Sequence, residues 1–198
     1  ELINLNYPPE PRLGPTNAPV LILQSNPSYE IHEPGGYANK GDLTESLRAL
    51  SDEQRPHKGA LASSGWWAPR LKELKNEVGK GPLSSCLLSV EFFPYRSLNF
   101  GHGEIRLPSQ WYTFSLVRDA IGRDAIIIVA RTWKLWVAAI PELFNQLNIT
   151  VFRTQSPRST YFSRKNMGNM AYDSVVKTTT WDTQTLDVQA DAHRVFLF

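Results

Sequence analysis

The amino-acid sequence predicts a single α/β domain, a three-layer α/β/α sandwich in which helices cover both faces of a central four-stranded parallel sheet. Four short apolar runs indicate the strands, and patterns with helical spacing lie between them. The runs are continuously apolar, which is typical of parallel strands that are buried on both faces. The predicted strands are Val20–Leu23, Cys86–Val90, Ala125–Ala130 and Ile149–Phe152.

The helices are predicted from apolar residues that recur every three or four positions. Three leucines share one face in the segment 43–50, and Gly79 marks the end of the segment 68–78. The predicted helices are Leu43–Leu50, Ala68–Val78, Trp111–Ile121, Trp133–Leu147 and Asn169–Lys177. Residues 1–17 are expected to form an irregular arm, because they are rich in Pro and Asn without periodicity. The sequence leaves open where the tail, residues 178–198, lies.

The composition is that of a globular protein that folds without a cross-link. The chain has 198 residues, 41% hydrophobic and 20% charged, which is enough for one sizeable core. Its one cysteine, Cys86, has no partner for a disulfide, which favours a reducing compartment. No apolar stretch reaches the roughly 20 residues that span a bilayer, and the first residues lack the pattern of a signal peptide. We therefore expect a cytoplasmic monomer that contacts no membrane.

The sequence contains no recognisable site for a metal or a nucleotide cofactor. Four scattered histidines and one cysteine lack the spacing of zinc or iron–sulfur ligands. There is also no GxxxxGK[ST] loop and no GxGxxG turn. We therefore expect no cofactor.

Positive charge is concentrated in one part of the chain. The net charge is only +2, but the segment from Arg123 to Lys165 holds seven Lys and Arg against Asp124 and Glu142. Such a segment favours a polyanionic partner such as DNA. A basic face that is merely solvated is an equally good interpretation of the same charges.

Ligands of open parallel sheets gather at the carboxyl ends of the strands, so function is expected just after Leu23, Val90, Ala130 and Phe152. Polar loops follow the first and the last of these strands. The first loop reads Gln24-Ser25-Asn26-Pro27-Ser28-Tyr29, and the last reads Arg153-Thr154-Gln155-Ser156-Pro157-Arg158-Ser159.

These two loops resemble the first and last motifs of the uracil-DNA glycosylase superfamily. An apolar strand followed by Asn26-Pro27 is similar to the first motif, and Ser156-Pro157-Arg158-Ser159 followed by Lys165–Gly168 is similar to the last. The nearest branches in motifs are the mismatch-specific and single-strand-selective ones, and the resemblance covers about residues 18 to 168. It implies a uracil-DNA glycosylase-like fold and a monofunctional DNA glycosylase. Such an enzyme flips out a damaged or modified pyrimidine and excises it, leaving an abasic site.

The resemblance also implies roles for individual residues. Asn26 would orient the attacking water, and Gln24 and Ser25 would contact the base. In the last loop, Arg158 would fill the gap left by the flipped base. The remaining residues that would hold DNA are Ser28, Thr154, Ser156, Pro157, Ser159 and Lys165. The alternative interpretation of Asn26 is that its side chain merely caps a turn.

The sequence departs from the family's pattern in two places. The family often has His where this chain has Thr154, and a base-reading Asn where an ungapped match places Glu91, which Phe92 follows. An ionised Glu can only accept hydrogen bonds, and the exocyclic amine of a cytosine-type base is the donor it prefers. Glu91 therefore favours a modified cytosine over uracil, unless Glu91 is solvated or ion-paired.

Three further residues are candidates for the walls of a pocket. The long connection 31–65 favours a roomy site in which Tyr29 or Tyr37 stacks on the base. For each tyrosine taken alone, ordinary packing is the stronger interpretation. His102, on the loop after the second strand, is a candidate acid or donor. The pair Trp66-Trp67 is interpreted as core or loop packing.

Two other functions fit the same sequence. A noncatalytic DNA-binding protein of the same fold is favoured by Thr154 and Glu91, and it would bind DNA without releasing a base. A nucleoside or sugar hydrolase is the second alternative, because a doubly wound fold does not determine function.

Overall fold

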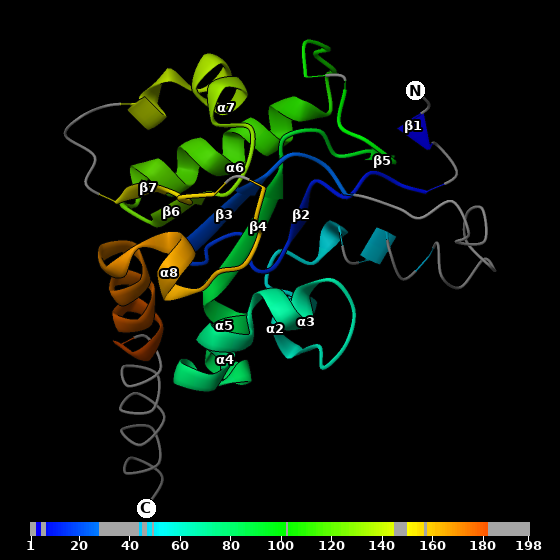
Figure 1. Ribbon diagram of the computed structural model, residues 1–198. Coiled ribbons are helices and arrows are strands. Elements are labelled where there is room, and N and C mark those ends of the chain that lie inside the picture. Colours follow the sequence, from blue (N-terminus) through cyan, green and yellow to red (C-terminus); the bar gives the residue numbers. More distant parts are fainter. Residues whose placement is uncertain are drawn as a thin grey trace, which may run out of the picture.

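The computed structural model describes residues 3–4, 7–27, 44, 47–48, 50–101, 103–144, 150–156 and 158–181. It is an α/β structure with a mostly parallel, open five-stranded sheet in the order β2-β4-β3-β6-β7 (Figure 1). All four predicted strands are confirmed, as β3 (Val20–Gln24), β4 (Leu87–Glu91), β6 (Ile126–Val129) and β7 (Val151–Arg153). These four strands run parallel to one another.

The predicted number of four strands is wrong, because β2 (Arg12–Leu13) adds an antiparallel edge strand beside β4. The arm 1–17 is therefore not irregular throughout. Its first residues also contain β1 (Ile3–Asn4), which pairs with β5 (Arg96–Ser97) in a separate two-stranded sheet. Both arm strands are two residues long, too short to show a period in the sequence.

Two hydrophobic cores on opposite faces of the sheet confirm the three layers. Alternate strand residues point to opposite faces, so Leu21 and Leu23 belong to one core while Val20 and Ile22 belong to the other. The first core packs under α6 (Gln110–Gly122), α7 (Trp133–Ala139) and η1 (Pro141–Phe144), and Trp136 is fully buried in it.

The second core is covered by another set of helices on the other side of the sheet, as Figure 1 shows. They are α2 (Lys58–Leu61), α3 (Trp67–Arg70), α4 (Lys72–Val78), α5 (Lys80–Cys86), α8 (Arg164–Met167) and the helix 169–181. The last of these continues four residues past the predicted end at Lys177. Residues 182–198 lie outside the described part.

Several helix boundaries differ from the predicted ones. The predicted helix 68–78 is divided at Leu71, whose ψ of 6° leaves the helical range. Cys86 ends α5, a helix that was not predicted, instead of starting a strand. The predicted helix 133–147 ends before Pro141, because proline has no N–H to continue the hydrogen-bond ladder. In the predicted helix 43–50, residues 44, 47, 48 and 50 are described, and all four are helical.

Within the described residues, no helix is long and apolar enough to cross a membrane. Cys86 is buried and forms no disulfide with a described residue.

Arg12 fixes the edge strand β2 to the rest of the domain. Its buried guanidinium donates to the carbonyls of Gly14, Leu50 and Asp52 at 2.9–3.1 Å and to the hydroxyl of Tyr112 at 2.9 Å. Gly14, directly after β2, has a φ of +114° and lies so close to β4 that a Cβ would stand 2.1 Å from the Leu87 carbonyl oxygen. The close approach of these two segments therefore requires glycine.

We expect Gly14→Ala to lower the free energy of unfolding by about 3 kcal/mol, because the added Cβ is both strained and in collision with backbone. Urea denaturation followed by circular dichroism measures the change. Gly122→Ala is the matched control, since nothing lies within 4 Å of its Cβ position, and its effect should stay within about 1 kcal/mol. Equal stabilities for the two variants would contradict the close packing of β2 on β4.

Candidate functional site

The candidate site lies at the carboxyl ends of β4, β3 and β6. After β3 the chain returns to form β4 on one side and later crosses to form β6 on the other. The loops that leave β3 and β6 therefore diverge, which is the position where open α/β sheets bind ligands.

Gln24 and Glu91 stand side by side at the ends of β3 and β4. They are paired in the parallel register, and both side chains point to the face covered by α2 and α3. The amide nitrogen Nε2 of Gln24 and the carboxyl oxygen Oε2 of Glu91 are buried without a hydrogen-bond partner. Because buried polar atoms in folded proteins are nearly always paired, this donor and this acceptor indicate a place for a ligand or water.

The end of β6 adds two more such atoms. Nε of Arg131 and Oγ1 of Thr132 are also buried without a partner. Thr132 adopts a left-handed backbone conformation, with a φ of 52° and a ψ of 36°, which is strained for a β-branched residue. Unpaired polar atoms and a strained backbone thus coincide on three neighbouring strand ends.

Glu91 has a strongly perturbed ionisation. Burial raises the pKa of its carboxyl to about 8, the carboxylate of Glu10 adds to this, and the charge of Arg131 opposes it. Glu10 is itself held by Arg96 at 2.7 Å. At neutral pH Glu91 is therefore mainly protonated, and it offers one donor and one acceptor.

This protonation changes the hydrogen bonds that Glu91 can make. The preference for cytosine assumed an ionised Glu91, whereas a neutral carboxyl has the same hydrogen-bonding pattern as the amide of Asn. It can donate to a ring nitrogen and accept from an exocyclic amine, or donate to a carbonyl and accept from a ring N–H. Glu91 therefore fits both cytosine-type and uracil-type edges.

Asn26 follows Gln24 by two residues, and its amide orientation is fixed. Its Nδ2 donates to the Pro27 carbonyl at 3.0 Å and to the Ser97 hydroxyl at 2.7 Å. The Ser97 hydroxyl donates its own hydrogen to the carbonyl of Asn99 at 2.9 Å, so it can only accept a hydrogen bond from Asn26. Both amide hydrogens are thus engaged, and the Oδ1 atom is left as an acceptor that can orient a water molecule.

The floor of the site is rigid. The Gln24 carbonyl accepts hydrogen bonds from the indole Nε1 of Trp136 at 3.0 Å and from the backbone of Phe92 at 3.3 Å. Phe92 is 0% exposed, and its ring packs edge-on against Trp136. Phe92 therefore belongs to the core and does not reach a base, in contrast to its predicted role. Ser25 is also buried, and its carbonyl accepts from the backbone of Phe93.

The loop after β7 contains the second predicted motif. Thr154 is buried, and its hydroxyl donates to the Ala130 carbonyl at 3.2 Å, so it is occupied in joining β7 to β6. Beyond it a turn is closed by a hydrogen bond from Ser159 to the Ser156 carbonyl at 3.1 Å. Arg158 and Lys165 are exposed, as residues that contact a phosphate backbone must be.

Asn166 holds this loop in place. Its buried side chain accepts from the backbone of Ser156 at 2.9 Å and donates to the carbonyls of Ser159 at 2.8 Å and Tyr161 at 2.9 Å. The backbone carbonyl of Asn166 also accepts from Gln155. One side chain on α8 therefore connects Ser156, Ser159 and Tyr161.

The structure thus places the predicted residue Gln24 beside Glu91, and Asn26 lies two residues beyond Gln24. Five other predicted site residues lie outside the described part of the chain: Ser28, Tyr29, Tyr37, His102 and Pro157. Sequence reasoning missed Arg131, Thr132 and the bracing role of Asn166. Arg131 and Thr132 directly follow the predicted strand 125–130. The expectation that functional residues lie just after the strands, which led to Gln24 and Glu91, therefore also applied to them.

Among the described residues, no group of three or more His, Cys, Asp and Glu is arranged to hold a metal ion. A scan against protein-family models found no matching family, and searches of curated proteins and of solved structures found no matching protein.

We expect Asn166→Asp to lower the free energy of unfolding by about 3 kcal/mol, because a carboxylate would face the two carbonyls that the amide now serves. Hydrogen exchange should also become faster at Ser156 and Ser159. Asn169→Asp, at an exposed position three residues along, is the control and should change neither quantity. Unchanged exchange in Asn166→Asp would contradict the bracing role.

Glu91 makes stability depend on pH in a defined direction. Its folded pKa of about 8 lies above the ordinary value of 4.5, so the unfolded chain releases this proton first as pH rises. The group's contribution to stability is therefore complete below pH 4.5 and is lost between about pH 4.5 and 8.

We expect Glu91→Gln to become more stable than the wild type as pH rises from 5 to 8, by about 3 kcal/mol at the upper end. Denaturation at several pH values measures the difference between the two proteins. Glu104→Gln, at an exposed position, is the matched control. A difference for Glu91→Gln that does not change with pH would show that Glu91 is ionised in the folded protein.

Proposed function

We propose that this protein is a monofunctional DNA glycosylase with a uracil-DNA glycosylase-like fold, which flips out a modified pyrimidine and hydrolyses its bond to deoxyribose. The observation that carries the proposal is the set of unpaired, buried polar atoms on Gln24, Glu91, Arg131 and Thr132. A hydrogen-bonding heterocycle is a ligand that satisfies such atoms, and the neighbouring loop offers Arg158 to DNA.

The proposed reaction uses Asn26 to position water and Glu91 to stabilise the leaving base. The water oxygen bonds to C1′ of the sugar while the bond from C1′ to the base nitrogen breaks. The base departs with the electron pair and takes up the proton that the water loses. The transition state resembles an oxocarbenium ion. A neutral Glu91 donates a hydrogen bond to the departing base and disperses its negative charge.

Asn26 acts by orientation, since an amide carbonyl accepts a hydrogen bond from water but does not remove its proton at neutral pH. Positioning of the reacting groups alone removes a large part of the activation barrier of such a reaction. The two donor bonds of Asn26 support this role, because they keep its carbonyl in a fixed direction.

One observation favours the noncatalytic alternative. Thr154 occupies the place where the resemblance leads us to expect His, and its hydroxyl is used by the Ala130 carbonyl. The site therefore lacks the histidine donor, and the proposal assigns the stabilisation of the leaving base to Glu91 instead.

The test is incubation with oligonucleotides that carry uracil, mismatched thymine, or plain and 5-substituted cytosines, followed by alkaline cleavage of abasic sites. Strand breaks with one class of base support the proposal and identify the substrate. Binding without breaks on every substrate contradicts it in favour of the noncatalytic protein. Release of base from free nucleosides alone favours the nucleoside hydrolase.

We expect Asn26→Ala to lower the rate of base release at least about a hundredfold, because the water loses its positioning group, while affinity for DNA stays nearly the same. Single-turnover cleavage and fluorescence anisotropy measure the two quantities. Asn17→Ala is the matched control, since Asn17 is exposed at the opposite, amino end of β3. Cleavage by Asn26→Ala at the wild-type rate would exclude the assigned mechanism.

A further inference from the structure

An exposed cluster of two aromatic rings and one arginine lies beside the candidate site. We call Trp66, Arg70 and Tyr161 the aromatic platform. Trp66 is 39% exposed and Tyr161 is 48% exposed. The Arg70 guanidinium carbon lies 4.0 Å from the centre of the Trp66 ring and 5.8 Å from that of Tyr161. The expected packing of the pair Trp66-Trp67 is present, with ring centres 4.7 Å apart, but Trp66 is not part of the buried core.

The platform is held in place before any partner binds. Arg70 donates from Nε to the Thr160 hydroxyl at 2.8 Å and from Nη1 to the Trp66 carbonyl at 2.6 Å. Its own carbonyl accepts from the backbone of Phe162 at 2.9 Å. Arg70 thus joins α3 to the loop after β7, although the two segments are about 90 residues apart in the sequence. Rigid rings lose little entropy when a partner stacks on them.

Electrostatic interactions connect the platform with the candidate site. Burial lowers the pKa of Arg70, Tyr161 raises it, and the positive charge of Arg131 lowers it further. Arg131 also acts on the ionisation of Glu91. Arg131 is therefore close enough to influence both the platform and the unpaired carboxyl.

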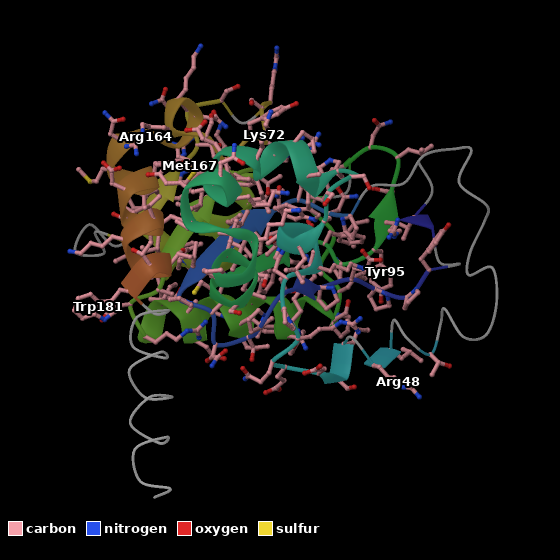
Figure 2. The ribbon with its side chains drawn as sticks, turned by 90° about the horizontal axis from the view of Figure 1, so that it is seen from below. Arg48, Lys72, Tyr95, Arg164, Met167 and Trp181 are labelled. Carbon is pink, nitrogen blue, oxygen red and sulfur yellow. The ribbon has the colours of Figure 1, made fainter. Side chains whose placement is uncertain are left out.

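A basic hollow adjoins the platform. It is lined by residues 62–65 and 68–69, by Asn76 and by three lysines, Lys72, Lys75 and Lys80, and none of its lining residues is acidic. Gly65 in this lining directly precedes Trp66. Figure 2 shows Lys72 of α4 and Arg164 of α8 along the same margin of the molecule, and the Arg164 backbone donates to Glu73 of α4 at 2.9 Å.

This combination has a specific chemical meaning. Exposed rings stack on nucleobases, arginine adds a cation–π contribution, and lysines attract phosphates. A ring face can stack on a base only if the base is not already stacked in a duplex.

We propose that the aromatic platform and the basic hollow bind single-stranded DNA next to the candidate site, with bases stacked on Trp66 and Tyr161 and phosphates in the hollow. This inference rests on the proposed function for its choice of DNA, and it assigns that enzyme a single-stranded substrate.

The test is fluorescence anisotropy with a labelled single-stranded oligonucleotide of the four unmodified bases, its duplex, and an RNA of the same sequence. We expect Trp66→Ala and Tyr161→Ala each to weaken binding of the single strand about tenfold, with little change for the duplex. Trp66→Phe, which keeps a stacking face, should retain most of the affinity. Trp111→Ala is the matched control, because Trp111 is 71% exposed on α6, across the sheet.

Wild-type affinity in both alanine variants would overturn the platform, as would an equal loss for duplex and single strand. RNA that binds about tenfold more tightly than DNA would overturn the choice of DNA. The oligonucleotide contains no modified base, so the assay reads binding alone. Absence of base release on every substrate would overturn the proposed glycosylase and leave a confirmed platform standing.

Discussion

The parallel pairing of β3 with both β4 and β6 is the interaction on which the rest of the structure depends. It buries a five-residue strand between two cores, since neighbouring residues of β3 point to opposite faces. The same register places Gln24 beside Glu91 and Leu23 beside Val129. The order of the strands then makes the loops diverge at this end of the sheet, so that polar side chains meet over an apolar floor.

The site is maintained at a cost in stability. Four buried polar atoms lack a partner, Thr132 has a strained backbone, and Glu91 is kept neutral by its surroundings. Each feature is unfavourable for folding. The core beneath offsets the cost, because the fully buried Trp136 packs against Phe92 and bonds to the Gln24 carbonyl. Unpaired polar groups and backbone strain above a well-packed core are typical of functional sites.

Two side chains from different helices shape the surface next to the site. Asn166 on α8 holds the loop from Ser156 to Tyr161, and Arg70 on α3 bonds to the same loop at Thr160. The loop therefore presents Arg158 and Tyr161 in a fixed arrangement. A nucleic acid would bind a surface that needs little further ordering, which favours affinity.

The sequence by itself determined the α/β class, the four parallel strands and the strand ends where polar residues gather, because continuous apolar runs and the loops after them are local features. Only the tertiary structure decided the edge strand β2, the protonation of Glu91 and the bracing by Asn166 and Arg70. Burial decides whether a carboxyl keeps its proton, and Arg70 and Thr160 are brought together only by packing of α3 on the loop. Such properties depend on contacts between residues far apart in the chain, and no local pattern records them.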